Sequence, residues 1–285
     1  MSEHLSRQMW RILEPIHSAI YFYPPAAQSY RDLGLKGGWM GYFATRSASL
    51  GTPGKDLVQS IFYHFSPDLV GRAIPDAWKY ATPEQILDTR MTIVQEMLSN
   101  FESHFQDPDL SSDIDLLLEI SRSLPGEGRP LFASLRGLVW ETSSHLKIFG
   151  AVTLLREHRG DTHNAALASH NISGAQSNIL QIANRAVSFK IISPNRGWSD
   201  QSWAEAMQDL KDRGIITNES TNQQPELTQK GQQIKNSIET LTDESSNPWS
   251  KISSQKLQDL TELLKPISDA VTESGLFPIE NPIGL

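Results

Sequence analysis

The sequence contains no cysteine, which excludes disulfides, thiolate metal ligands and cysteine nucleophiles. Any metal would need His, Asp, Glu or carbonyl oxygens as ligands. Long hydrophobic runs are also missing, and residues 1–20 mix charged side chains such as Arg7 and Glu14 with apolar ones. We therefore expect neither a secretory leader nor a membrane span, and we expect a cytoplasmic protein.

Positive charge is scarce in this chain. The 25 Lys and Arg residues stand against 33 Asp and Glu residues, for a net charge of −8. This charge disfavours nonspecific contact with nucleic-acid phosphates or anionic lipid. Residues 51–55 lack the full phosphate-loop pattern, and the dinucleotide-binding, zinc-protease and serine-hydrolase motifs are also missing. Nucleotide-dependent and serine-hydrolase chemistry are therefore disfavoured.

Helical patterning covers most of the 285 residues and predicts a mainly α fold. Apolar residues at spacings of three and four predict a first helix over residues 5–20, bent at Pro15. Thr82-Pro83-Glu84-Gln85 combines a capping residue, a first-turn proline and a capping-box glutamine. This segment predicts the start of a long buried helix that extends to about residue 105.

Polar and Pro/Gly-rich segments suggest the domain boundaries. We expect an N-terminal helical lobe (1–124), a second helical lobe (131–195), a winged-helix-like module (196–247) and a C-terminal helix and tail (248–285). A weak similarity between residues 41–51 and 163–174 is compatible with a degenerate internal repeat or with a chance likeness of alanine-rich helices. A repeat would place a small-molecule pocket between the two lobes.

The winged-helix-like module is predicted from a helix over 200–213, a short β-hairpin that begins at Ile215-Ile216, and a further helix after residue 226. In a DNA-binding protein the first of these helices would enter the major groove. Its charges argue against that role, because four acidic side chains oppose only Lys211 and Arg213. We favour packing or dimerisation as the use of this module.

Several short motifs carry a resemblance to a known family; they lie at residues 13–17, 41–46, 62–65, 128–131, 155–163, 196–198 and 281–285. Through these motifs nearly the whole chain resembles an actinobacterial family labelled helix-turn-helix. The resemblance implies a fold with a winged-helix-like part, and it implies no catalytic residues.

The richest polar cluster is His158-Arg159-Gly160-Asp161-Thr162-His163, at an expected helix break. A break at Gly160 would let His158 and His163 share one site, which an unbroken helix would prevent. We assign His158, Asp161 and His163 as candidate catalytic residues, with Arg159 binding an anion. The alternative is structural: Asp161 or Thr162 caps the following helix, and Arg159 pairs with Asp161.

A second candidate group lies on the first helix. Glu14, His17 and Tyr21 are three and four residues apart and project from adjoining turns. We assign Glu14 and His17, with His158 and His163, as candidate ligands of a divalent metal, and Tyr21, Arg46 and Arg159 as candidate ligand-binding residues. Hydrogen-bonded core packing is the alternative, as it is for His64.

Three functions remain open from the sequence. The favoured one is a small-molecule-binding helical protein, or an enzyme that uses the His/Asp/Glu/Arg cluster in an interlobe pocket. The second is a ligand-responsive DNA-binding transcription regulator. The third is an interaction protein that forms homodimers through the winged-helix-like module. The sequence names no substrate or reaction.

Overall fold

The computed structural model describes residues 4–104, 110–140 and 142–284. Its regular secondary structure is almost wholly helical, which confirms the predicted mainly α class. Its α-helices are α1 (Leu5–Ser18), α2 (Pro24–Asp32), α3 (Gly37–Ser47), α4 (Lys55–Ile61), α5 (Pro67–Gly71), α6 (Pro83–Ser99), α7 (Leu110–Arg122), α8 (Pro130–Arg136), α9 (Ser144–Ser169), α10 (Gly174–Ala183), α11 (Phe189–Arg196), α12 (Asp200–Asp212), α13 (Gln229–Ser245) and α14 (Ser254–Glu273).

The predicted capping box starts α6. The Thr82 hydroxyl accepts the Gln85 N–H at 3.3 Å, and the Gln85 side chain accepts the Thr82 N–H at 2.9 Å. These two bonds satisfy donors that a helix start leaves unpaired. The helix ends at Ser99, earlier than predicted, and residue 105 lies outside the described residues.

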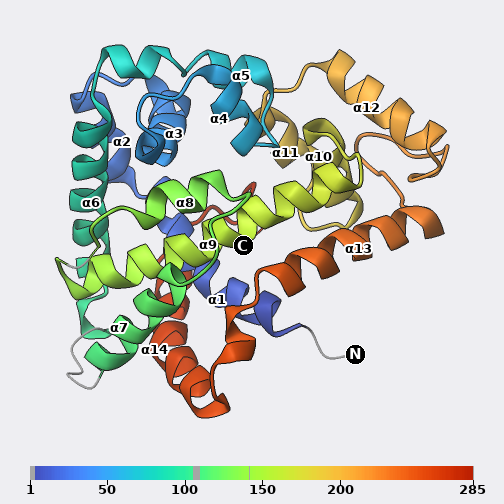
Figure 1. The fold of residues 1–285 in the computed structure, drawn as a ribbon. Helices are drawn as coiled ribbons and strands as arrows, with labels where there is room; N and C mark the ends of the chain where they lie inside the picture. Colours follow the sequence, from blue (N-terminus) through green and yellow to red (C-terminus); the bar gives the residue numbers. More distant parts are fainter. Residues whose placement is uncertain (1–3, 105–109, 141, 285) are drawn as a thin grey trace.

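Helix α9 is the central element of the fold and packs against α1, α6, α7, α8 and α13 (Figure 1). Up to Leu155 its apolar side chains belong to a large hydrophobic core built with α1, α3, α6, α7 and α14. From Ala166 onward they belong to a smaller core built with α10, α12 and α13. The polar segment 156–165 of α9 therefore lies between the two cores. The division of the chain into helical lobes at 1–124 and 131–195 stays a prediction.

The predicted break at Gly160 is wrong, because α9 runs without interruption from Ser144 to Ser169. A glycine inside a helix costs only about 1 kcal/mol relative to alanine. Packing on both sides of this residue, by the two cores, offsets such a cost.

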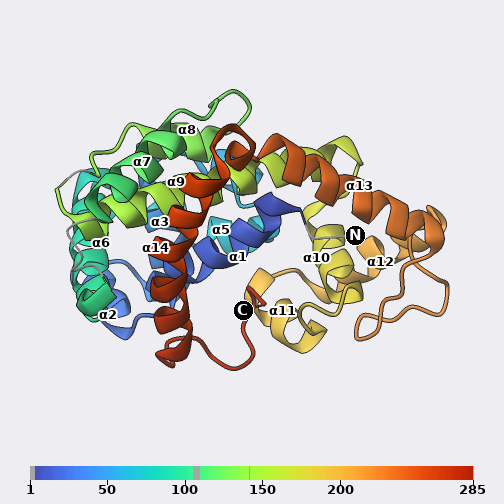
Figure 2. The ribbon, with the colours of Figure 1, turned by 90° about the horizontal axis from the view of Figure 1, so that it is seen from below.

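The helices of the winged-helix-like module form as α12 and α13, but the predicted β-hairpin is not seen among the described residues. Between these helices there is one isolated antiparallel bridge, from Ile216 to Leu227. Polar groups of the intervening segment bond to one another within that segment. For example, the Ser220 hydroxyl accepts the Glu226 N–H at 2.9 Å. Figure 2 shows α12 and α13 at one end of the molecule, away from α2, α6 and α7.

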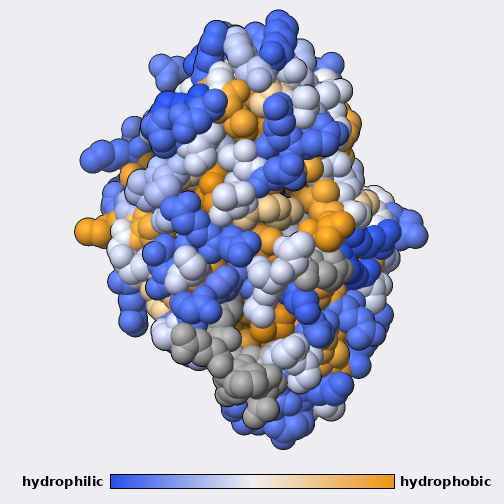
Figure 3. All heavy atoms as spheres, turned by 90° about the vertical axis from the view of Figure 1, so that its left-hand side faces the viewer, coloured by the Kyte–Doolittle hydropathy of each residue, from blue (hydrophilic) through white to orange (hydrophobic). Residues whose placement is uncertain are grey.

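The surface over α2, α6 and α7 is mixed in character. Figure 3 shows hydrophobic residues there in separate small groups between hydrophilic ones. In residues 4–104, 110–140 and 142–284, no helix combines the length and hydropathy that a membrane crossing requires.

Candidate functional site

A cluster of charged side chains lies in the interior where α1, α3 and α9 meet. The Glu157 carboxylate accepts hydrogen bonds from Arg46, at 2.6 Å, and from Arg156, at 3.0 Å. Arg156 also pairs with Glu14, whose carboxylate lies 3.2 Å from its Nε and accepts the Trp10 indole N–H at 3.0 Å. Two of the predicted residues, Glu14 and Arg46, therefore belong to one ion-pair network. They are its two ends, joined through Arg156 and Glu157.

His17 and Tyr21 complete this cluster. The Tyr21 hydroxyl lies 2.8 Å from His17 Nε2, and His17 Nδ1 lies 3.0 Å from the Thr153 hydroxyl. Burial, reinforced by the positive charge of Arg156, holds the pKa of His17 well below its usual value. The ring is therefore neutral at neutral pH, and it donates one hydrogen bond and accepts another.

The Glu157 carboxylate is the electrostatic centre of the cluster. Burial alone would raise its pKa, but the guanidinium groups of Arg156 and Arg46 outweigh burial and hold the pKa far below the usual range. Glu157 is therefore ionised, and it is the group that keeps two buried guanidiniums compensated.

A third arginine, Arg90 of α6, lies beside this cluster and is only 2% exposed. Its guanidinium donates to the Thr45 carbonyl at 3.2 Å and sits 5.5 Å from the Phe149 ring centroid. Within the described ranges, no carboxylate lies within 4 Å of it. The cluster therefore holds three arginines against the two carboxylates of Glu14 and Glu157.

The cluster is not sealed from solvent. The Arg156 side chain is 22% exposed, and the rings of Tyr21 and Tyr42 are half-buried. A cavity of about 10 Å³ borders Arg156 and is also lined by Arg159, Ser6, Trp10 and Ser246, among others. A cavity of this size holds roughly one water molecule.

His158 and Asp161 lie apart from the cluster and face α8. The His158 ring packs edge-on against Phe132, and burial together with the nearby Arg129 lowers its pKa to about 4 although the Pro125 carbonyl opposes this. The Asp161 carboxylate accepts the Phe132 N–H at 3.0 Å, and burial raises its pKa to about 7. Asp161 thus stabilises the start of a preceding helix, and the prediction that it caps the following one is wrong.

Arg159 and His163 point to α13. Arg159 forms an ion pair with Asp243 at 2.7 Å, so its predicted pairing with Asp161 is wrong. His163 Nδ1 lies 3.2 Å from the Thr242 hydroxyl. On an unbroken helix His158 and His163 are about 140° apart, because each residue turns the helix by about 100°. The structure therefore separates these two histidines.

The predicted metal ligands Glu14, His17, His158 and His163 do not converge on one point. Across the residues with described positions, no group of three or more His, Asp or Glu side chains has the arrangement of a metal site. Their individual roles stay predictions.

Sequence reasoning missed Arg90, Arg156, Glu157 and Thr153. Thr153, Arg156 and Glu157 are three and four residues apart in an otherwise apolar helix, and this spacing is the signal that could have revealed them. No comparable signal marks Arg90, since an arginine on a helix is ordinarily exposed.

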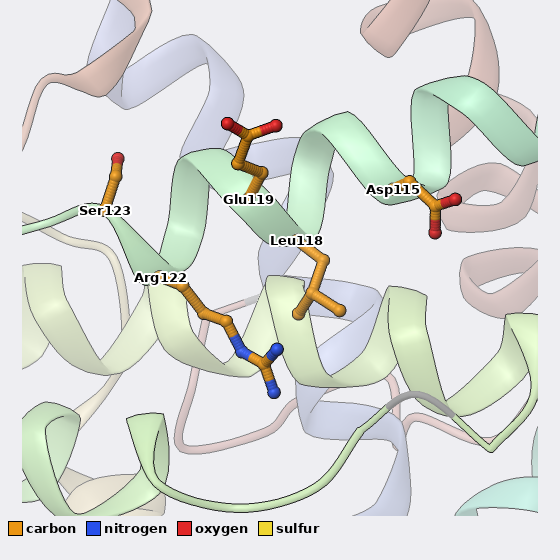
Figure 4. A pocket seen from close by; sticks show the side chains of 5 residues that line it. All are labelled: Asp115, Leu118, Glu119, Arg122 and Ser123. Carbon is orange, nitrogen blue, oxygen red and sulfur yellow. The ribbon is translucent and has the colours of Figure 1, made fainter.

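Another hollow lies elsewhere, along α7. This open depression of about 440 Å³ is lined by Asp115, Leu118, Glu119, Arg122 and Ser123 (Figure 4). Leu118 and Arg122 project from one side of the helix and Glu119 from the other. None of the predicted site residues lines it.

Comparison with known proteins agrees with the motifs. No curated protein and no solved structure matches the chain. The sequence pattern of a family described as the helix-turn-helix family matches residues 6–278, out of 285. The chain therefore belongs to the helix-turn-helix family.

Proposed function

We propose that this protein binds a small anionic molecule, with a carboxylate or phosphate group, at the charged cluster of Glu14, His17, Arg46, Arg90, Arg156 and Glu157. The observation that carries the proposal is Arg90, the buried arginine that leaves the cluster with one guanidinium more than it has carboxylates. A buried guanidinium without a carboxylate partner is costly, and such a cost is typical of sites that a ligand completes.

The chemistry around Arg90 suits an anion. A guanidinium binds a carboxylate or phosphate through two parallel N–H donors. Arg90 lies close enough to Tyr21 and Tyr30 to lower the pKa of both hydroxyls, against the larger raising effect of burial. The Tyr30 hydroxyl is a further hydrogen-bond donor for the same anion, whereas the Tyr21 hydroxyl already bonds to His17. The proposal concerns binding, and it assigns no reaction to the cluster.

Thermal unfolding in the presence of a panel of mono- and dicarboxylates and phosphate monoesters tests this function. A ligand that binds only the folded state raises Tm with its concentration. Arg90→Met should abolish the response.

Arg136→Met is the matched control. Arg136 also donates to a backbone carbonyl, that of Leu124 at 2.9 Å, and lies 5.6 Å from a phenylalanine ring, but it is exposed. This variant should keep the response. The proposal fails if no anion in the panel shifts Tm, or if both variants respond like the wild type.

A second candidate function is DNA binding by α12, and family membership favours it. Helix α12 lies at the outer edge of the molecule (Figure 1), as a groove-reading helix must. The charge opposes this use, because residues 196–247 contain five basic and nine acidic side chains.

Fluorescence anisotropy at low salt, with labelled DNA from the region upstream of the gene, tests DNA binding. Binding with a steep loss on added salt would support the second candidate. No binding at micromolar protein would eliminate it.

A further inference from the structure

A second arginine without a carboxylate partner lies near the charged cluster, at the end of α11. Arg196 is the last residue of this helix, and its guanidinium lies 4.8 Å from the ring centroid of Phe65. It donates to the Pro282 carbonyl at 3.1 Å. Within the described ranges, its buried Nε has no hydrogen-bond partner and no carboxylate lies within 4 Å of its guanidinium. The side chain is partly exposed, so a ligand can reach it.

The local sequence holds the backbone of Arg196 in place. Gly197, directly after it, ends α11 with a left-handed φ of 72°. A Cβ at Gly197 would lie 2.7 Å from the Cβ of Leu69, so glycine is what lets the end of α11 pack against α5. The Arg196 carbonyl accepts the Ser66 N–H at 2.8 Å, at the start of α5. Arg196 is therefore fixed beside Phe65, the residue before Ser66.

A row of three aromatic rings connects Arg196 to the charged cluster. The ring centroids of Phe65 and Tyr42 are 5.6 Å apart, and those of Tyr42 and Tyr21 are 5.2 Å apart. At the cluster, Arg46 donates to the Tyr42 hydroxyl, and its guanidinium lies 5.6 Å from the Tyr21 ring centroid. The rings of Tyr42 and Tyr21 are half-buried, so one side of this row is open to a ligand.

Electrostatics also connects Arg196 to the cluster. Burial lowers the pKa of its guanidinium, and the positive charges of Arg46 and Arg156 lower it further, although Tyr42 opposes them. Glu157 does not relieve this repulsion at Arg196, because its carboxylate already binds Arg46 and Arg156. An anion beside Arg196 would relieve it.

We propose that the ligand of the cluster carries two separate anionic groups, and that Arg196 binds the second of them. This inference rests on the proposed function, in which Arg90 binds the first. Two guanidiniums without carboxylate partners favour a ligand with two negative charges. They lie over different rings, Phe149 and Phe65, which favours two separate groups over one. The ligand class is therefore a dicarboxylate or a phosphorylated carboxylate, whose linking part lies along the row of rings.

Calorimetric titration of the full chain with dicarboxylates of increasing length, each compared with its own monoamide, tests the proposal. The monoamide keeps the length and one carboxylate but lacks the second charge. In the wild type the best-bound dicarboxylate should bind about tenfold or more tighter than its monoamide, since hydrogen bonds to a charged group contribute that much. In Arg196→Met the preference should fall to roughly twofold, because a symmetrical dicarboxylate still offers Arg90 either of its two carboxylates. A ratio measured within one variant is independent of any change in stability.

Arg213→Met is the matched control. Arg213 is also partly exposed and donates to a backbone carbonyl, that of Asn171 at 2.7 Å, but it pairs with Asp209 at 3.2 Å. This variant should keep the wild-type preference. If the wild type binds dicarboxylate and monoamide alike, if Arg196→Met keeps the preference, or if Arg213→Met loses it equally, this inference is overturned and the proposed function stands. If no anion binds the wild type, both are overturned.

Discussion

The charged cluster on α1, α3 and α9 differs sharply from the module of residues 196–247. In the cluster, charged groups are buried and positive charge is in surplus. In the module, the core is apolar, with Trp203, Leu210 and Ile238, and the charges lie mostly on the surface with an acidic excess. The segment predicted to be winged-helix-like is thus the one whose charge suits DNA binding least, while the unusual polar chemistry lies in the other region.

Glu157→Gln should produce the largest difference between the two regions. Loss of the charge leaves Arg46 and Arg156 without their shared partner, and the free energy of unfolding should fall by about 3–5 kcal/mol. Urea unfolding measures this loss. The same change at Glu205, exposed on α12, should shift stability by less than about 0.5 kcal/mol. Equal losses at both positions would contradict the comparison.

Residue patterns predicted the local structure well because caps and helical spacing act over three or four residues. The capping box at Thr82 forms where predicted, and α12 begins at residue 200 as predicted. The contact of Arg46 with Glu157 spans 111 residues and depends on how whole helices pack, so one sequence does not reveal it.

The candidate site was predicted only in part. Glu14, His17, Tyr21 and Arg46 do come together, but the assumed break at Gly160 placed His158 and His163 in one site. The unbroken helix sends them to different neighbours. Two of the motifs behind the family resemblance meet in space, since Arg196 donates to the Pro282 carbonyl at 3.1 Å.

The pH dependence of stability should also distinguish the buried part of α9 beside the cluster from the module. Burial raises the pKa of Asp161 to about 7, so the folded state favours the protonated form. Its contribution to stability is present at low pH and is lost as pH rises through about 7. Asp161→Asn should therefore gain on the order of 2–4 kcal/mol relative to the wild type between pH 5 and pH 8.

Urea unfolding at several pH values measures this gain. Asp200→Asn, exposed at the start of α12, is the control and should show a constant difference from the wild type. A pH-independent effect of Asp161→Asn would show that its carboxyl group is ionised throughout.

The smallest expected effect is in the module. Arg213 pairs with Asp209 at 3.2 Å and donates to the Asn171 carbonyl at 2.7 Å, with a partly exposed side chain. Arg213→Met should cost about 1 kcal/mol in unfolding free energy. Lys211→Met, beside it, should cost less, since the Lys211 side chain has no ion pair with any described residue. If Arg213→Met lowered the unfolding free energy by several kcal/mol, the charged side chains of the module would contribute as much to stability as those of the cluster.

The central claim is that Arg90, the buried arginine without a carboxylate partner, serves to bind an anion. The unfolding free energy of Arg90→Met, in buffer without multivalent or carboxylate anions, tests this claim most directly. If Arg90 is retained for binding, removal of an uncompensated buried charge should leave stability unchanged or raise it, as replacements of binding-site residues commonly do. If Arg90 is retained for folding, the variant should lose about 2 kcal/mol or more, through the lost bond to Thr45 and the lost packing on Phe149. The account predicts the first result, and the second would contradict it.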